Sequence, residues 1–138
     1  MVQTLKFLLD SVILIDHFNG IEPASRFIER EAHRSAISVI TRAEVLAGAR
    51  PRALGKVTRL LDLFPNLEIS ADIADMAAAL RRKQRWKLPD ALQAAVARRY
   101  KLRLATRNTR DFRPDIHRFV LVPYRLDRGR RGHSMASI

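Results

Sequence analysis

The chain has 138 residues, of which 47% are hydrophobic, which is enough to build the core of one folded domain. It has no cysteine, which excludes disulfide bonds, thiolate catalysis and zinc–thiolate sites and suits a reducing compartment. No apolar run reaches the roughly eighteen residues of a membrane helix, and Asp10 and Asp16 interrupt the apolar start, which does not resemble a signal peptide. We therefore expect a cytoplasmic protein that does not interact with membranes.

The net charge of +12 is unevenly distributed along the chain. Residues 1–80 carry nine Lys and Arg against ten Asp and Glu (9 − 10 = −1), whereas residues 81–138 carry seventeen against four (17 − 4 = +13). A polyanion is the expected partner of the second half, and nucleic acid is the commonest polyanion. The alternative is a solubilising surface or an acidic protein partner.

The first half of the chain alternates between predicted strands and helices. An apolar run that begins at Lys6 predicts a buried strand that ends at Asp10. Ser11 is expected to cap a helix that ends at residues 19–20. An amphipathic helix is predicted over 23–33 and a second strand over 35–40. The next predicted helix begins at Thr41 and ends near Gly48.

The second half continues the alternation. Helices are predicted over 52–64, from Ser70 to about Arg85, and from Lys87 to Tyr100, and strands over 67–69, 102–106 and 119–122. This order indicates an α/β fold, with a central parallel sheet of four or five short strands between two helical layers. We expect one domain over 1–126, followed by a basic, disordered tail over 127–138 that contains Arg128, Arg130 and Arg131.

Four carboxylates occupy equivalent places in this pattern. Asp10 ends the first strand, Glu44 lies in the first turn after the second strand, Asp90 lies in a first helical turn, and Asp111 follows the 102–106 strand. Because strand ends and helix starts meet at one edge of a parallel sheet, the four side chains are expected to converge there. Each acid alone also has a structural explanation. Glu44 fits a capping box with Thr41, and the charge of Asp90 is favourable at a helix N-terminus. Asp10 could cap the helix that follows it, and Asp111 could be a turn residue.

Clustered carboxylates repel one another, and a divalent cation relieves that repulsion. Oxygen ligands without cysteine, and with only scattered histidines, favour Mg²⁺ or Mn²⁺ over zinc. Beside a basic half, such a site predicts hydrolysis of phosphodiester bonds by a metal-activated water.

Four segments of the chain carry a family resemblance. They are 7–16 (FLLDSVILID), 37–44 (ISVITRAE), 87–95 (KLPDALQAA) and 106–112 (TRNTRDF). In order and at this spacing they resemble the signature segments of PIN-domain ribonucleases, and most of all the VapC toxins of bacterial VapBC toxin–antitoxin pairs. The resemblance covers about residues 5–124. Two positions depart from the family pattern: Val12 stands where many members have Asn, and Trp86 stands in a region where Gly is usual. We expect Trp86 to be packed in the core rather than stacked on a base.

The resemblance implies a PIN-like fold and an endoribonuclease toxin that depends on Mg²⁺ or Mn²⁺ and cuts RNA, typically tRNA or rRNA. It places the catalytic and metal-binding acids at Asp10, Glu44, Asp90 and Asp111, with Ser11, Thr106 and Asn108 in support. It also implies homodimers, a cognate VapB-like antitoxin that blocks the site, and contact with promoter DNA only through that antitoxin. The side chains predicted to contact RNA are Arg81, Arg82, Arg85, Lys87, Arg107 and Arg110.

Other readings of the same acids remain open. A phosphoacceptor or phosphatase would use Asp10 as a nucleophile, but haloacid-dehalogenase-type enzymes need a second Asp where this chain has Val12. Receiver domains need a Lys after a late strand, and none follows the 102–106 strand. A PIN-domain RNA-processing nuclease that is not a toxin, and a non-catalytic RNA-binding PIN-like domain, are further alternatives. Four intact acids favour a nuclease.

Overall fold

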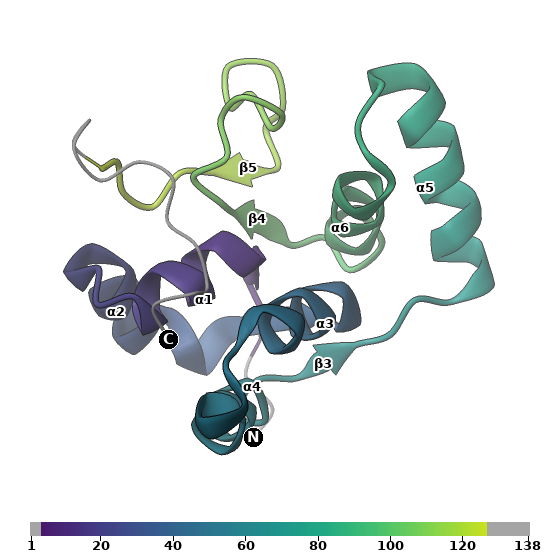
Figure 1. Ribbon diagram of the computed structural model, residues 1–138. Coiled ribbons are helices and arrows are strands. Elements are labelled where there is room, and N and C mark those ends of the chain that lie inside the picture. Colours follow the sequence, from purple (N-terminus) through teal and green to yellow (C-terminus); the bar gives the residue numbers. More distant parts are fainter. Residues whose placement is uncertain (1–3, 127–138) are drawn as a thin grey trace.

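A computed structural model describes residues 4–126 of the chain (Figure 1), so the segment predicted as a disordered tail lies outside the described residues. The strands are β1 (Phe7–Leu9), β2 (Ser35–Ser38), β3 (Asn66–Leu67), β4 (Arg103–Ala105) and β5 (Val120–Leu121). The helices are α1 (Ser11–Phe18), α2 (Glu22–Glu31), α3 (Val39–Gly48), α4 (Leu54–Leu61), α5 (Ala71–Gln84) and α6 (Leu88–Arg99), with short 3-10 helices η1 (Ala32–Arg34) and η2 (Pro51–Ala53). The predicted alternation of strands and helices is confirmed.

All five strands are parallel and form one sheet in the order β3-β2-β1-β4-β5. The first strand therefore lies at the centre, where Leu8 is in register with Ala36 on one side and Leu104 on the other. A strand paired on both edges and covered on both faces needs an unbroken apolar run, and the residues of β1 supply it.

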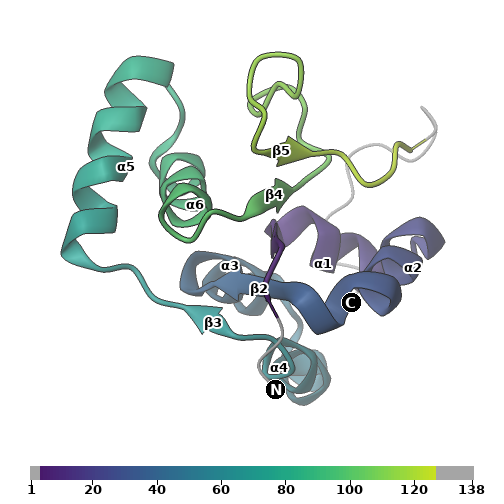
Figure 2. The ribbon, with the colours of Figure 1, turned by 180° about the vertical axis from the view of Figure 1, so that it is seen from behind.

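Alternate residues of the strands point into two separate cores. Leu8, Leu104 and Val120 pack against α5 and α6, whereas Phe7, Leu9 and Ile37 pack against α1, α2, α3 and α4. Because side chains of a strand alternate between the faces of its sheet, the sheet becomes the middle of three layers. The view from behind shows the pair α5 and α6 on one side of the strands and α1 and α2 on the other (Figure 2). The predicted three-layer α/β/α architecture is confirmed.

Several predicted boundaries were wrong, for local reasons. The second strand ends at Ser38 rather than residue 40, because the Ser38 side chain accepts a hydrogen bond from the Thr41 amide and starts α3. The cap of α1 is Asp10, whose carboxylate accepts from the Ser11 amide, and not Ser11. The helix predicted over 52–64 is shortened to α4, with η2 before it. In the described part of the chain, no helix has the length and apolarity needed to cross a membrane.

Candidate active site at the carboxyl edge of the sheet

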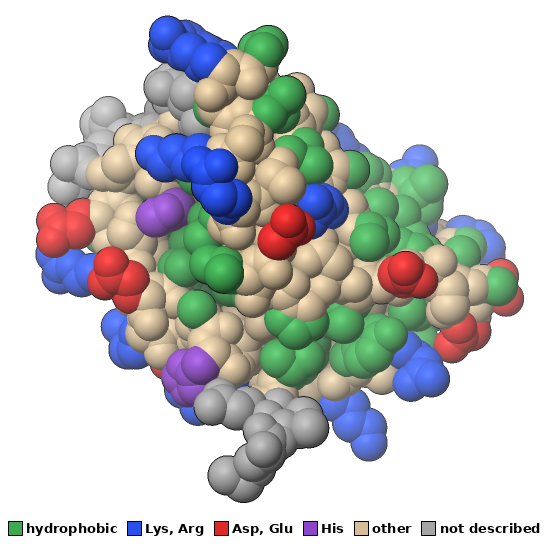
Figure 3. Space-filling view, turned by 90° about the horizontal axis from the view of Figure 1, so that it is seen from below, with side chains coloured by type: hydrophobic (Ala, Val, Ile, Leu, Met, Phe, Trp, Pro, Cys, Tyr) green, Lys and Arg blue, Asp and Glu red, His purple; other side chains and the backbone are tan. Residues whose placement is uncertain are grey.

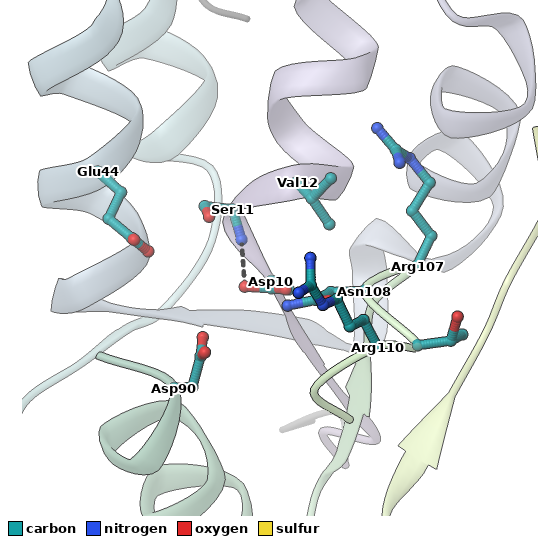
Figure 4. Close-up of a pocket in the computed structure, with 9 residues that line it drawn as sticks. Asp10, Ser11, Val12, Glu44, Asp90, Arg107, Asn108 and Arg110 are labelled. Atoms are coloured by element: carbon teal, nitrogen blue, oxygen red, sulfur yellow. Dashed lines mark hydrogen bonds between the residues drawn. The ribbon is translucent and has the colours of Figure 1, made fainter. Parts of the chain in front are cut away.

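A cavity of about 490 Å³ opens at the carboxyl ends of the central strands. Parallel strands end at a common edge, and in open α/β sheets ligands bind there. Residues from α1, α3, α6 and the loop after β4 surround the cavity (Figure 4); they are Asp10, Ser11, Val12, Glu44, Asp90, Arg107, Asn108, Thr109 and Arg110. Three of the four predicted acids therefore meet in one pocket, from segments that are far apart in the sequence.

Asp10 is the most enclosed of these acids, with 7% of its surface exposed. Its carboxylate accepts hydrogen bonds from the Thr106 hydroxyl at 2.7 Å, the Ser11 amide at 2.9 Å and the Gln93 side-chain amide at 3.3 Å. Burial raises the pKa of Asp10, and the three hydrogen bonds oppose that rise. These three hydrogen bonds hold the Asp10 carboxyl in one orientation in the cavity.

Gln93 belongs to a buried polar cluster that the sequence analysis did not identify. Its amide N–H donates to the Thr41 hydroxyl at 2.7 Å, and its carbonyl accepts from the Ser38 hydroxyl. Thr41 in turn donates to the Leu9 carbonyl at 3.2 Å. The cluster therefore joins α6, α3 and β1 directly beneath Asp10. The signal in the sequence was that Gln93 is the one polar residue between Ala91 and Ala97, one helical turn after Asp90.

Glu44 and Asp90 face the cavity from α3 and α6 (Figure 4). The Glu44 carboxyl is partly desolvated, which raises its pKa; the charges of Asp10 and Asp90 add to the rise, and a hydrogen bond with the Ser11 side chain opposes it. Desolvation, together with the charges of Asp10 and Asp111, raises the pKa of Asp90 to about 6. The capping-box explanation of Glu44 fails, because the Thr41 amide that begins that motif bonds Ser38 instead. Neighbouring carboxylates thus contribute to the raised pKa values of both Glu44 and Asp90, as expected of a close acidic cluster.

Asp111 lies beside the cavity rather than in its wall. The Asn108 side chain holds it in a local turn: its N–H donates to the Asp111 carboxylate at 3.1 Å and its carbonyl accepts from the Asp111 amide at 3.4 Å. The indole N–H of Trp86 donates to the Asp111 carbonyl at 2.9 Å. Trp86 is buried against Phe112, so its predicted packing is confirmed, and it also anchors the segment that carries the fourth acid.

The donor set of this cluster suits a hard divalent cation. Within residues 4–126, no Lys, Arg or His forms an ion pair with Asp10, Glu44, Asp90 or Asp111. Four unneutralised carboxyls, with oxygen as their donor atom, have the chemistry that Mg²⁺ and Mn²⁺ prefer. The described residues contain no ready-made group of three acidic or histidine ligands around one point. Mg²⁺ usually keeps several waters and binds through one or two carboxylates plus substrate phosphate, so a looser cluster is compatible with it.

The predicted RNA-contacting cations divide into two groups. Arg107 and Arg110 line the cavity, whereas Arg81, Arg82, Arg85 and Lys87 lie outside its wall. Arg81 donates to the Trp86 carbonyl at 2.8 Å, which closes the turn between α5 and α6. That turn contains Arg85, whose φ of 58° places it in the left-handed region as the C-cap of α5.

From its place in the helix predicted after Asp10, Asp16 is expected to be a helix-surface acid rather than an outer metal ligand. This prediction is wrong, because Asp16 is fully buried. Its carboxylate receives both Nε and Nη2 of Arg107, at 2.5 and 2.8 Å, and the Tyr124 hydroxyl at 2.8 Å. These bonds raise the pKa of Arg107, and burial beside Asp16 raises that of Tyr124. The three residues tie α1, the loop after β4 and the C-terminal segment together, and they fix the wall of the cavity next to Asn108.

Desolvation of Asp90, together with its repulsion by Asp10 and Asp111, predicts a specific dependence of stability on pH. The folded-state pKa of Asp90, about 6, lies above its ordinary value of 3.8, so the folded state binds the proton more tightly than the unfolded state. Ionised Asp90 therefore destabilises the fold above about pH 6, and the penalty disappears as the pH falls toward 4. Without metal, Asp90→Asn is expected to have a higher Tm than the natural protein at pH 7.5, by a margin that shrinks at pH 4.5. Circular dichroism melting in EDTA measures this, and a margin that is the same at both pH values would contradict it.

Comparison with known proteins agrees with the fold. A family model described as the PIN domain matches residues 7–114. Ribonuclease VapC10 from Mycobacterium tuberculosis (strains CDC 1551 / Oshkosh and H37Rv) is 38% identical over 112 residues, which are 76% of this chain and 84% of the relative.

Among solved structures, a toxin–antitoxin complex from Klebsiella pneumoniae superposes with a TM-score of 0.79 at 40% identity, covering 88% of this chain and all of that chain. A DNA-bound VapBC from Salmonella typhimurium has a TM-score of 0.70 at 24% identity over 79% of this chain and 91% of its own, which is a likeness of fold. The chain belongs to the PIN-domain family, and within that family to the VapC type.

Proposed function

We propose that the chain is a divalent-metal-dependent endoribonuclease and the toxin of a type II toxin–antitoxin pair, with Asp10, Glu44, Asp90 and Asp111 as its metal-binding and catalytic acids. The observation that carries the proposal is the cavity at the carboxyl edge of the sheet, whose acids form no ion pair with a Lys, Arg or His of the described residues. The 38% identical relative named as a ribonuclease, and the 40% identical chain from a toxin–antitoxin complex, support it.

Each part of the cavity has a role in this proposal. Mg²⁺ or Mn²⁺, when bound by the acids, would neutralise charge on the scissile phosphate and activate a water molecule. Thr106 and Gln93 hold Asp10, whose carboxylate would bind the ion, and a hydrogen bond with the Ser11 side chain orients Glu44. Arg107 and Arg110 provide positive charge on the same wall, where an RNA phosphate would otherwise meet only carboxylates.

A partner protein is part of the proposal. A cognate VapB-like antitoxin would cover the cavity, promoter DNA would be contacted only through that antitoxin, and the free toxin would be a homodimer in the cytoplasm. The side of the molecule on which α4 lies shows patches of hydrophobic side chains among charged ones (Figure 3). Leu54, the first residue of α4, and Leu63, just after this helix, are exposed, and exposed hydrophobic residues among charged ones suit a protein partner.

Incubation of the purified protein with total tRNA and rRNA tests the proposed activity. We expect discrete fragments with Mg²⁺ or Mn²⁺ and no cleavage with EDTA. Cleavage that persists in EDTA would contradict a metal-dependent mechanism. Loss of cleavage on addition of the antitoxin encoded next to the toxin gene would support the pairing.

The Thr106 hydroxyl is expected to act as a positioning group for Asp10. Thr106→Val keeps the size of the side chain but removes the donor at 2.7 Å from Asp10 and the acceptor for the Asn108 amide at 3.0 Å. Loss of a group that orients a metal ligand typically lowers metal affinity or activity by about 10- to 100-fold. Thr106→Ser should restore most of the cleavage rate, and should require less Mg²⁺ for half-maximal rate than Thr106→Val. Equal rates for the Val and Ser variants would show that the hydroxyl has no such role.

A further inference from the structure

A second cavity, of about 350 Å³, lies between the end of α5, the end of α6 and the loop before β5. Its wall contains apolar and aromatic groups together with three cations, and it has no Asp or Glu; the residues are Leu80, Lys83, Gln84, Trp86, Ala94, Arg98, Ile116, His117, Arg118 and Phe119. None of them lines the acidic cavity. Its size is within the range of small-ligand pockets, about 300–1,000 Å³.

The three cations of this cavity lack acidic partners. Lys83, Arg98 and Arg118 come from three different segments, are exposed, and form no ion pair within residues 4–126. Neighbouring cations in the described chain do have partners: Arg99 pairs with Asp72, and Arg113 pairs with Asp115. Three like charges around one hollow repel one another, and an anionic ligand relieves the repulsion.

Aromatic side chains form part of the wall of this cavity. The ring centroid of His117 lies 5.2 Å from that of Trp86 and 5.8 Å from that of Phe119, and Ile116 beside them is 59% exposed. Aromatic groups combined with cations form the usual platform for single-stranded nucleic acid, in which bases stack and phosphates meet Lys and Arg.

Trp86 connects this cavity to the acidic one. Its ring lines the second cavity, and its indole N–H donates to the Asp111 carbonyl, in the segment that carries the fourth acid. The two cavities are therefore linked through Trp86 and the segment that carries Asp111.

We propose that the second cavity is a subsite for a nucleotide of the RNA substrate outside the scissile position, with its phosphate held by Lys83, Arg98 and Arg118 and its base against His117 and Phe119. The proposal rests on the proposed ribonuclease function, because RNA is the occupant. An acidic, apolar peptide of a protein partner is the alternative occupant, and the test below distinguishes it.

Trp86 makes the test direct, since it is the one tryptophan of the chain and lies in the cavity wall. A short single-stranded RNA titrated into the full chain in EDTA is expected to change the tryptophan fluorescence saturably. Arg98→Gln combined with Arg118→Gln should weaken this binding about tenfold at 0.1 M salt and reduce the slope of log affinity against log salt by about 0.7, the value for one lost phosphate contact. The matched control is Arg52→Gln combined with Arg59→Gln, two exposed cations of η2 and α4 that should leave the signal unchanged.

The outcomes separate this subsite from the proposed activity. Three results would each overturn the subsite. The first is a saturable signal that the Arg98 and Arg118 changes leave unaltered, and the second is no signal with RNA. The third is a signal with an acidic apolar peptide but not with RNA. Any of these results together with Mg²⁺-dependent cleavage would leave the proposed nuclease intact. RNA binding that depends on Arg98 and Arg118 without any cleavage would instead support the subsite and reject the nuclease.

Discussion

Asp10→Asn is expected to lower RNA cleavage by at least about 10³-fold while leaving the fold intact. Removing a metal-holding carboxylate forfeits several kcal/mol of charge stabilisation in the transition state, and about 4 kcal/mol corresponds to that factor. The reason for expecting a normal fold lies in the environment of the side chain: burial raises the pKa of Asp10, so the ionised form is costly in the folded protein.

The asparagine side chain fits the same hydrogen bonds. Its carbonyl can accept from the Ser11 amide and from Gln93, and the Thr106 hydroxyl can rotate to accept from the new N–H. The Tm in EDTA should therefore equal or exceed that of the natural protein, while the cleavage rate collapses. Asp75→Asn, an exposed acid on α5, is the matched control and should retain full activity. Cleavage by Asp10→Asn at the natural rate would exclude Asp10 from the reaction.

Asp16→Asn is expected to cause the largest loss of stability among the acidic positions. Asp16 is fully buried and pairs with Arg107, whose side chain is 22% exposed, so the change leaves a largely enclosed guanidinium without a counter-charge. Breaking a buried pair from one side costs about 3–5 kcal/mol, and partial exposure of Arg107 places the expectation near 3 kcal/mol. In a domain of this size that corresponds to a fall in Tm of about 10 °C.

An exposed ion pair provides the matched comparison. Asp115 accepts two hydrogen bonds from Arg113, as Asp16 does from Arg107, but both partners are solvent-exposed. Asp115→Asn should therefore change the free energy of unfolding far less than Asp16→Asn does. Urea unfolding of both variants measures the difference, and equal losses would mean that burial of Asp16 does not determine the strength of its pairing.

Asp16→Asn should also affect the cavity, because Arg107 shares its wall with Asn108 and Arg110. Once released from Asp16, Arg107 is free to turn toward the acids and compete with a divalent cation. We expect the variant to need more Mg²⁺ for half-maximal cleavage, which loss of stability alone would not produce below the melting temperature.

The parts of the site that the sequence predicted are those fixed by the ends of regular elements. Asp10 and Asp90 were placed correctly because an acid at the end of an apolar strand or in a first helical turn has only one location relative to a parallel sheet. Gln93 was missed because its importance depends on Ser38 and Thr41, which approach it across 55 and 52 positions of the chain. A polar residue in an apolar helix is visible in the sequence, but its partners are not.

The prediction for Asp16 failed for the same reason. Asp16 was predicted to lie on the exposed face of its helix, whereas it is buried, and its partners Arg107 and Tyr124 lie 91 and 108 positions away in the sequence. Pairing across the fold overrides the local pattern at Asp16. The end of the second strand was instead decided by one local contact, in which the Ser38 hydroxyl accepts a hydrogen bond from the Thr41 amide.

Binding of Mn²⁺ in the absence of RNA, measured by electron paramagnetic resonance, tests most directly whether the four acids form a metal site. The natural protein should bind Mn²⁺ saturably, and Asp10→Asn, Glu44→Gln, Asp90→Asn and Asp111→Asn should each weaken it by at least about tenfold, while Asp75→Asn should not. If the natural protein takes up no Mn²⁺, or if all of these variants bind it equally well, the four acids do not form a metal site.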